Sequence, residues 1–185
     1  MKTAFTLIFL PVFLIAALIS LNGCALYDAA RDERSVGTIV DDDTILAKVK
    51  YRLYRDDAVK GSDISVYSFE GKVFLVGALE DKKQGIRAVE IAHGVAGVRS
   101  VDTYFLDKNQ LSLGKTVDDA AITTKIKAKL IGDMEIKSTQ IEVKTIMGHV
   151  VLLGIVGSEK ERQRAIDYAR MVRYVKKVKS FIMVK

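Results

Sequence analysis

From Asp41 onward the sequence repeats itself with a constant offset of 77 residues and without a gap. The motif Gly-x-Val-x-Leu-x-Gly occupies residues 71–77 and returns at residues 148–154. The residues on both sides of this motif keep the same spacing, and the corresponding pairs include Ile45 and Ile122, Val49 and Ile126, Leu53 and Leu130, Ala88 and Ala165, and Ala92 and Ala169. A repeat of this length predicts two copies of one folding unit, residues 41–107 and 118–185, joined by a linker at residues 108–117.

Each copy contains two helical patterns. At its start, apolar residues recur at every fourth position with lysine or arginine between them, which is typical of an amphipathic helix. The acids Asp41 to Asp43 and Asp118-Asp119 precede these patterns and are suited to cap a helix N-terminus. The second helical pattern spans residues 83–93 in the first copy and 159–173 in the second.

Three strand patterns complete each copy. Alternation at residues 64–66 and 141–143 is typical of half-buried strands, and Glu70-Gly71 and Met147-Gly148 are typical of hairpin turns. The returning strands are expected at 73–76 and 150–153, and the last strands at 98–106 and 175–184. The predicted fold is therefore α+β, with two tandem αββαβ domains, each having two helices on one face of a three-stranded mixed sheet. Each copy is small but adequate for a single domain, so a fragment starting near Lys115 is expected to fold alone.

The order of these motifs resembles the BON domain. The resemblance rests on an acid before an I-x3-V/I-x3-L helix, then I-x-V, a turn glycine, V-x-L-x-G, an A-x3-A helix and a closing V-x2-V, all of which occur twice. The first copy also has the Gly97-Val98 step of the family, whereas the second has Tyr174-Val175, so the last turn of the second copy is expected to differ. The resemblance implies binding rather than catalysis. For family members with a lipid anchor it implies contact of the second domain with anionic phospholipid and support of the outer-membrane barrier.

An apolar leader at residues 1–23 precedes the two copies. It starts positively at Lys2 and carries no charge from Ala4 to Ile19, as in a secretory signal peptide. A membrane-spanning helix is the alternative, but Pro11 interrupts the run and no basic cluster follows it. The leader ends Leu-Asn-Gly-Cys24, which resembles the bacterial lipobox, whose cysteine takes a diacylglycerol and becomes the new N-terminus.

Cys24 is the only cysteine, so the exported fold cannot depend on a disulfide. Residues 24–40 have mixed charge and little periodicity, and they are expected to form a tether between the lipid and the domains. By resemblance to enterobacterial sorting rules, Ala25 in place of an aspartate favours the outer membrane. The expected location is therefore the outer membrane, lipid-anchored and facing the periplasm.

The two copies differ in charge. Residues 41–107 carry 10 Lys and Arg against 12 Asp and Glu, whereas residues 118–185 carry 14 against 8. This asymmetry fits attraction of the second copy to anionic headgroups, and a solvated face is the plainer interpretation. Nucleic acid would suit such a patch, but export behind a lipid anchor argues against it.

No catalytic constellation is evident, and neither a cofactor nor a metal is expected. His93 and His149 occupy unrelated positions in the two copies and are interpreted as ordinary surface histidines. Asp41 to Asp43 could suggest a metal site, but the recurrence of the acids at Asp118-Asp119 favours helix capping. An enzyme of the envelope is therefore not favoured.

A candidate phospholipid site lies on the first helix of the second copy. Burial of its apolar stripe leaves Lys125, Lys127 and Lys129 outside, with Ile131 and Met134 as a small apolar tip, and such a combination suits an anionic interface. The first copy keeps basic residues at 48, 50 and 52 but has Tyr54 and Asp57 instead of the tip. The alternative is that Ile131 and Met134 close the core over the sheet.

The favoured function is that of a non-enzymatic envelope lipoprotein that binds anionic phospholipid, or outer-membrane assembly proteins, and supports envelope integrity. The rival hypothesis is a soluble-type osmotic or envelope stress protein that binds partner or unfolded proteins as a holdase. The sequence leaves the oligomeric state and the relative orientation of the two domains open.

Overall fold

The computed structural model describes residues 32–111 and 118–185, which lie almost wholly in one compact unit, Glu33–Lys185. The leader, Cys24 and residues 112–117 of the predicted linker lie outside the described residues. Within the described ranges, no helix is both long enough and apolar enough to cross a membrane.

The first repeat follows the predicted αββαβ order. Its elements are α3 (Val36–Arg55), a 3-10 turn (Gly61–Asp63), β1 (Ile64–Phe69), β2 (Lys72–Leu79), α4 (Lys82–His93), β3 (Ser100–Asp107) and the short α5 (Lys108–Leu111). The sheet order is β1-β2-β3, with β1 antiparallel and β3 parallel to β2. The short α5 occupies the start of the predicted linker.

The second repeat has the same topology. Its elements are α6 (Asp119–Ile131), a 3-10 turn (Ser138–Gln140), β4 (Ile141–Ile146), β5 (His149–Val156), α7 (Glu159–Arg170) and β6 (Lys177–Val184). The sheet order is β4-β5-β6, again with one antiparallel and one parallel pair. The predicted fold class is confirmed, although α7 and the last strands are shorter than their patterns suggested.

The N-terminus of α3 differs from the prediction. The helix begins at Val36, where the Ser35 side chain accepts a hydrogen bond of 3.2 Å from the backbone N–H of Thr38. Asp41 to Asp43 therefore lie inside the helix and do not cap it, so the capping interpretation is wrong for the first repeat. Residues 36–40, assigned to the tether, belong to α3. In the second repeat Asp118 does cap α6, through a 2.9 Å bond from the N–H of Ala121.

Each repeat has its own core between helices and sheet. In the first, α3 contributes Ile45, Val49 and Leu53, which meet β2 and the small residues of α4. The equivalent residues of α6 and α7 do the same in the second repeat. Alanines on α4 and α7 let the second helix of each repeat approach the sheet closely.

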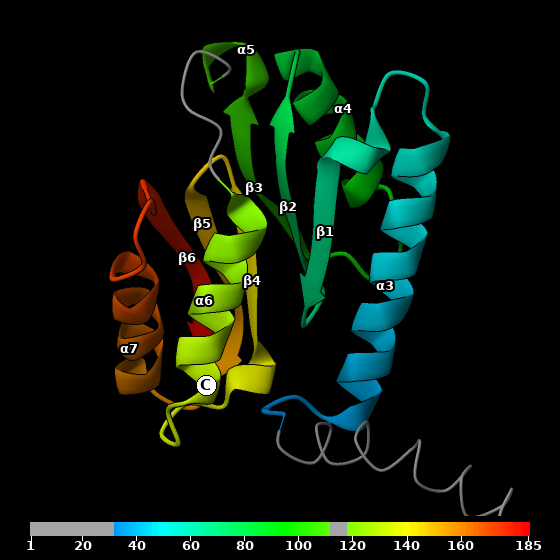
Figure 1. Cartoon of the computed structure of the whole chain (residues 1–185). Coiled ribbons are helices and arrows are strands. Elements are labelled where there is room, and N and C mark those ends of the chain that lie inside the picture. Colours follow the sequence, from blue (N-terminus) through cyan, green and yellow to red (C-terminus); the bar gives the residue numbers. More distant parts are fainter. Residues whose placement is uncertain (1–31, 112–117) are drawn as a thin grey trace, which may run out of the picture. The chain divides into compact units, whose positions relative to one another are not determined.

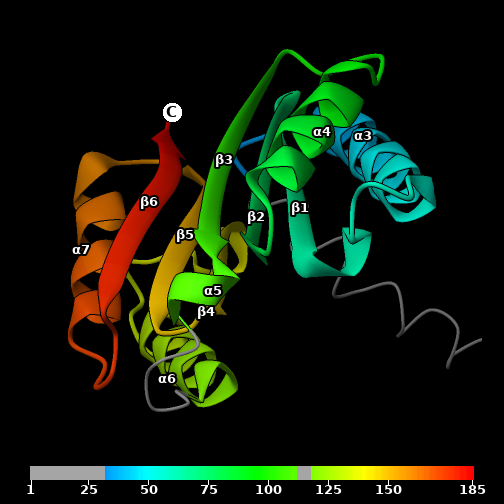
Figure 2. The same cartoon turned by 90° about the horizontal axis from the view of Figure 1, so that it is seen from above.

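A third apolar cluster lies between the two sheets. Its buried members come from both repeats: Phe69, Phe74 and Val76 from the first, and Val151, Leu153 and Ile155 from the second. The ring centroids of Phe74 and Phe181 are 5.1 Å apart. The sheets thus pack face to face, with α3 and α4 outside one sheet and α6 and α7 outside the other (Figures 1 and 2). The half-buried strand patterns did not predict this contact.

Polar groups at the edge of this interface also join the repeats. The Lys185 ammonium lies 2.6 Å from the Glu70 carboxylate and donates to the Glu33 carbonyl at 2.8 Å. Glu33 also forms an ion pair with Lys137. The segment that enters α3 is therefore attached to the second repeat as well as to the first.

Candidate functional site

The helix α6 presents the predicted lysines to solvent. Ile122, Ile126 and Leu130 are buried on one stripe, and Lys125, Lys127 and Lys129 are all exposed. The exposed positions follow from the helical period, because residues three and four apart share a face.

The three lysines do not form one cluster. The Lys129 ammonium lies 6.0 Å from the ring centroid of Tyr168 on α7. Lys127 instead lies 3.6 Å from the carboxylate of Glu142 on β4. Since Lys125 is one turn before Lys129, the structure brings Lys125 and Lys129 together on the α7 side and separates Lys127 from them.

The predicted apolar tip is exposed. Ile131 is 72% exposed and Met134 is 101% exposed. The alternative that these side chains close the core over the sheet is therefore wrong. At the corresponding place in the first repeat, Tyr54 is 80% exposed and Asp57 is also exposed, so the tip is aliphatic only in the second repeat.

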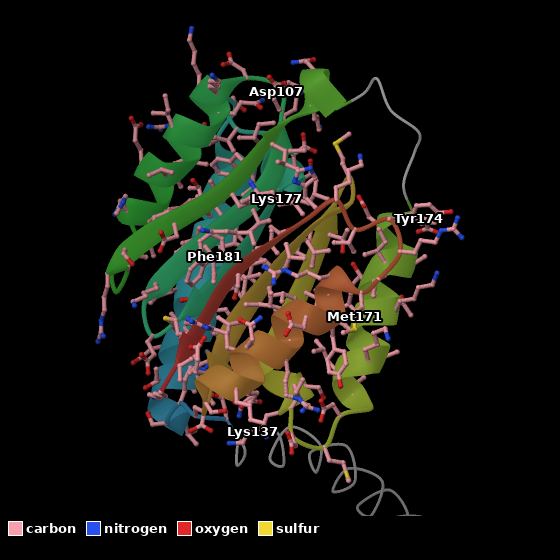
Figure 3. The ribbon with its side chains drawn as sticks, turned by 90° about the vertical axis from the view of Figure 1, so that its left-hand side faces the viewer. Asp107, Lys137, Met171, Tyr174, Lys177 and Phe181 are labelled. Carbon is pink, nitrogen blue, oxygen red and sulfur yellow. The ribbon has the colours of Figure 1, made fainter. Side chains whose placement is uncertain are left out.

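The segment between α7 and β6 carries a second exposed apolar group that the sequence analysis missed. Met171 is 68% exposed and Tyr174 is 61% exposed, and Figure 3 shows both on the side where α6 and α7 lie. The Arg173 guanidinium carbon lies 4.7 Å from the centroid of the Tyr174 ring. At the corresponding positions the first repeat has Gly94, Ala96 and Gly97.

Residues 170–179, which run from the end of α7 into β6, account for most of the charge difference between the repeats. Residues 170–179 contain five cations and no acid, whereas residues 93–102 contain one arginine and one aspartate. The lysines of α6 do not account for the difference, because α3 has basic residues at all three equivalent positions. A position-by-position comparison of charge between the repeats would have found the segment from the sequence.

Equivalent contacts in the first repeat show how this segment borders α6. The Arg52 guanidinium donates a 2.7 Å hydrogen bond to the carbonyl of Gly94. The corresponding residues of the second repeat are Lys129 and Met171, which places the end of α7 beside the C-terminal half of α6.

The same comparison with the first repeat places Tyr174 beside the N-terminal half of α6. A Cβ atom added to Gly97 would lie 3.1 Å from the Cδ1 atom of Ile45, and the equivalent residues are Tyr174 and Ile122. We call Lys125, Lys129, Met171, Arg173 and Tyr174 the basic surface. It combines cations with exposed apolar side chains on one flank of α6.

The repeated aspartates hold the hairpins. The carboxylate of Asp42 is 2% exposed and accepts hydrogen bonds from the backbone N–H groups of Glu70 and Gly71, at 2.7 and 2.9 Å, and from the Ser68 hydroxyl. In the second repeat Asp119 accepts the N–H groups of the corresponding hairpin turn. Among the described residues no group of three His, Cys, Asp or Glu is arranged to hold a metal ion.

The two histidines differ in environment. His93 is exposed, as predicted, but His149 is half-buried at the interface, and its Nδ1 lies 2.8 Å from the Tyr104 hydroxyl of the first repeat. Burial, followed by the charges of Lys176 and Lys177, lowers the pKa of His149. The interpretation of His149 as an ordinary surface histidine is therefore wrong, and the side chain is a polar link between the repeats.

Two αββαβ units that share an apolar interface define the class of protein. The BON domain family model matches residues 41–106 and 118–185, and the chain belongs to the BON domain family.

Three relatives are similar over most of their length. The chain is 39% identical over 152 residues to Osmotically-inducible protein Y of Escherichia coli strain K12, covering 81% of this chain and 76% of that protein. It is 35% identical over 148 residues to a 21 kDa hemolysin of Actinobacillus pleuropneumoniae, covering 80% and 76%. It is 31% identical over 165 residues to Outer membrane lipoprotein DolP of Haemophilus influenzae, covering 89% and 84%.

Proposed function

We propose that this chain is a non-enzymatic protein of the cell envelope whose second BON domain binds anionic phospholipid, at the inner leaflet of the outer membrane, and supports envelope integrity. The observation that carries the proposal is the basic surface, where Met171, Arg173 and Tyr174 of the second repeat take the place of Gly94, Ala96 and Gly97 of the first. The names of the osmotically inducible and outer-membrane relatives support an envelope role.

The physical basis is the sum of two weak attractions. Each Lys or Arg close to an anionic membrane contributes about 1 kcal/mol, and this attraction weakens within a Debye length. Exposed apolar side chains add to it by entering the boundary between headgroups and acyl chains. The chain therefore needs both the cations and the apolar tips to bind well.

The attachment of the N-terminal segment to the second repeat also supports contact of this repeat with the membrane. Only eight residues separate Cys24 from Glu33 along the chain, and such a segment spans at most about 30 Å. Glu33 is paired with Lys137, which closely follows the exposed tip at Met134. A lipid on Cys24 would therefore keep the exposed end of α6 within reach of the bilayer.

Co-sedimentation with liposomes tests the proposal. The unlipidated protein, residues 25–185, is expected to bind vesicles that contain phosphatidylglycerol or cardiolipin at low salt, and to bind neutral vesicles weakly. The double variant Lys125→Glu/Lys129→Glu should lose most of this binding, because surface charge reversal spares the core. The matched control is Lys48→Glu/Arg52→Glu, at the equivalent positions of α3. If the wild type ignores anionic vesicles, the proposal is wrong.

Lipid attachment is tested separately in cells. Labelling with radioactive palmitate is expected for the wild type and not for Cys24→Ala. A labelled variant would show that the lipid is carried elsewhere.

A second candidate function is binding of partner or unfolded proteins. The observation that favours it is an apolar groove of about 520 Å³ between α4 and β3, lined by Leu79, Val89 and Phe105, with Ile86 exposed beside it. Suppression of the aggregation of a heat-denatured test protein measures this activity, and Ile86→Asp should reduce it. No suppression by the wild type would exclude this candidate.

A further inference from the structure

Tyr174 has an unusual backbone conformation. Its φ angle is +72°, in the left-handed region that residues with a side chain rarely adopt. The equivalent residue of the first repeat is Gly97, with a φ angle of +94°. Glycine adopts this conformation without steric cost, so the second repeat retains a tyrosine at a position where glycine would be the more stable choice.

Packing does not explain the tyrosine. Its side chain is 61% exposed and lies outside the three buried clusters. Its ring instead stacks with the Arg173 guanidinium, 4.7 Å from the centroid. Strain that the core does not require is often associated with function, and here it accompanies an aromatic ring that faces solvent among cations.

We propose that Tyr174, with Met171 beside it, is the anchor by which the second repeat enters an anionic bilayer. This inference rests on the proposed function and names the residues that insert. A tyrosine ring suits the headgroup level, since its body is apolar and its hydroxyl is polar. Arg173, stacked on the ring, is positioned to bind a phosphate at the same depth, because a guanidinium forms paired hydrogen bonds with phosphate oxygens.

The first repeat supplies the comparison. It has Gly94 and Gly97 where the second has Met171 and Tyr174, although α3 and α6 carry equivalent basic residues. If the helix cations alone decided binding, both repeats would bind. The anchor explains why the second repeat should bind and the first should not.

The first test replaces the anchor by the residue of the first repeat. Tyr174→Gly is expected to fold with an unchanged or higher melting temperature, because it relieves the strained backbone. Its partition to vesicles containing phosphatidylglycerol should fall about tenfold, as expected for loss of a largely buried aromatic contact. The control Tyr54→Gly removes an exposed tyrosine of the first repeat and should leave the partition unchanged.

The second test uses the absence of tryptophan from the chain. In Tyr174→Trp the single indole should shift its emission to the blue on addition of anionic vesicles, and lipids with brominated acyl chains should quench it. Tyr54→Trp is the matched control and should show neither effect.

The outcomes separate this inference from the proposed function. If Tyr174→Gly binds like the wild type while Lys125→Glu/Lys129→Glu does not, the anchor is wrong and the phospholipid function stands. An indole at position 174 that remains in water while the protein sediments with vesicles would also overturn the anchor. If the wild type does not bind at all, the proposed function itself is wrong.

Discussion

At the scale of single residues, each repeat has an aspartate in its first helix whose carboxylate accepts hydrogen bonds from the backbone of a hairpin turn. The carboxylate of Asp42 accepts two backbone N–H groups of the turn and also contacts Arg34 at 2.9 Å. Removal of this acceptor would leave the two backbone N–H groups, one buried and one partly buried, without their hydrogen bond. The neighbouring Asp41 and Asp43 are exposed and have no such role.

The substitution Asp42→Ala is expected to lower the free energy of unfolding by about 3 kcal/mol or more, because it leaves the N–H groups of Glu70 and Gly71 and the Ser68 hydroxyl without their shared acceptor. Chemical denaturation measures the loss. Asp43→Ala is the control and should change stability by no more than about 0.5 kcal/mol. Equal effects of the two substitutions would contradict the role assigned to Asp42.

At the scale of elements, two segments of each repeat cross so closely that the last residue of the repeated motif must be glycine. In the second repeat, a Cβ atom on Gly154 of β5 would lie 2.0 Å from the carbonyl oxygen of Gln140, at the end of the 3-10 turn that leads into β4. Its φ angle is +141°. At Gly77 the corresponding distance to the Asp63 carbonyl is 2.4 Å, so the same crossing occurs in both repeats.

We expect Gly154→Ala to destabilise the second repeat by about 3 kcal/mol or more, since the turn and the strand must separate to admit a methyl group. Gly132→Ala is the comparison, because an added Cβ there would lie 3.4 Å from the nearest atom and the φ angle is −72°. Thermal unfolding of the two variants should differ clearly, and similar melting temperatures would argue against the crossing.

At the scale of the whole molecule, the two repeats are joined by an apolar interface as well as by the linker. Each repeat has a core of its own, yet the inner faces of both sheets are buried only through their contact. A repeat taken alone would expose Val151, Leu153 and Ile155 to water, which disfavours the isolated form.

A fragment of residues 115–185 should therefore fold but be less stable than the full chain by about 2 kcal/mol or more. It should also bind a hydrophobic dye that the full chain excludes. Circular dichroism on denaturant titration compares the two proteins. A fragment as stable as the full chain would show that the shared cluster contributes nothing.

The interface should also respond to pH. Burial beside Lys176 and Lys177 lowers the pKa of His149 in the folded state. Below the ordinary histidine pKa of about 6.5, the unfolded chain takes up a proton that the folded chain resists, so stability is lost as the pH falls from that value. The melting temperature should fall less between pH 7.5 and 5.5 in His149→Gln than in the wild type. An equal fall would exclude His149 as the cause.

Much of the fold and part of the site could be predicted from the sequence. The offset of 77 residues, the helical stripes and the strand alternation are properties of neighbouring residues, and they predicted two αββαβ units with Lys125, Lys127 and Lys129 exposed. The same local logic misplaced the start of α3, because three consecutive acids are good caps by composition and the sequence does not indicate that Asp42 is needed at a hairpin 28 residues away.

The sequence by itself determined the repeat, the topology of each unit and the charge asymmetry, since each is encoded in spacing and composition. The tertiary structure decided which sheet faces met, which lysines of α6 came together, and that Met171 and Tyr174 lie on the same flank of α6. The physical reason is that a side chain's period assigns it to a face, whereas its neighbours across the molecule depend on how whole elements pack.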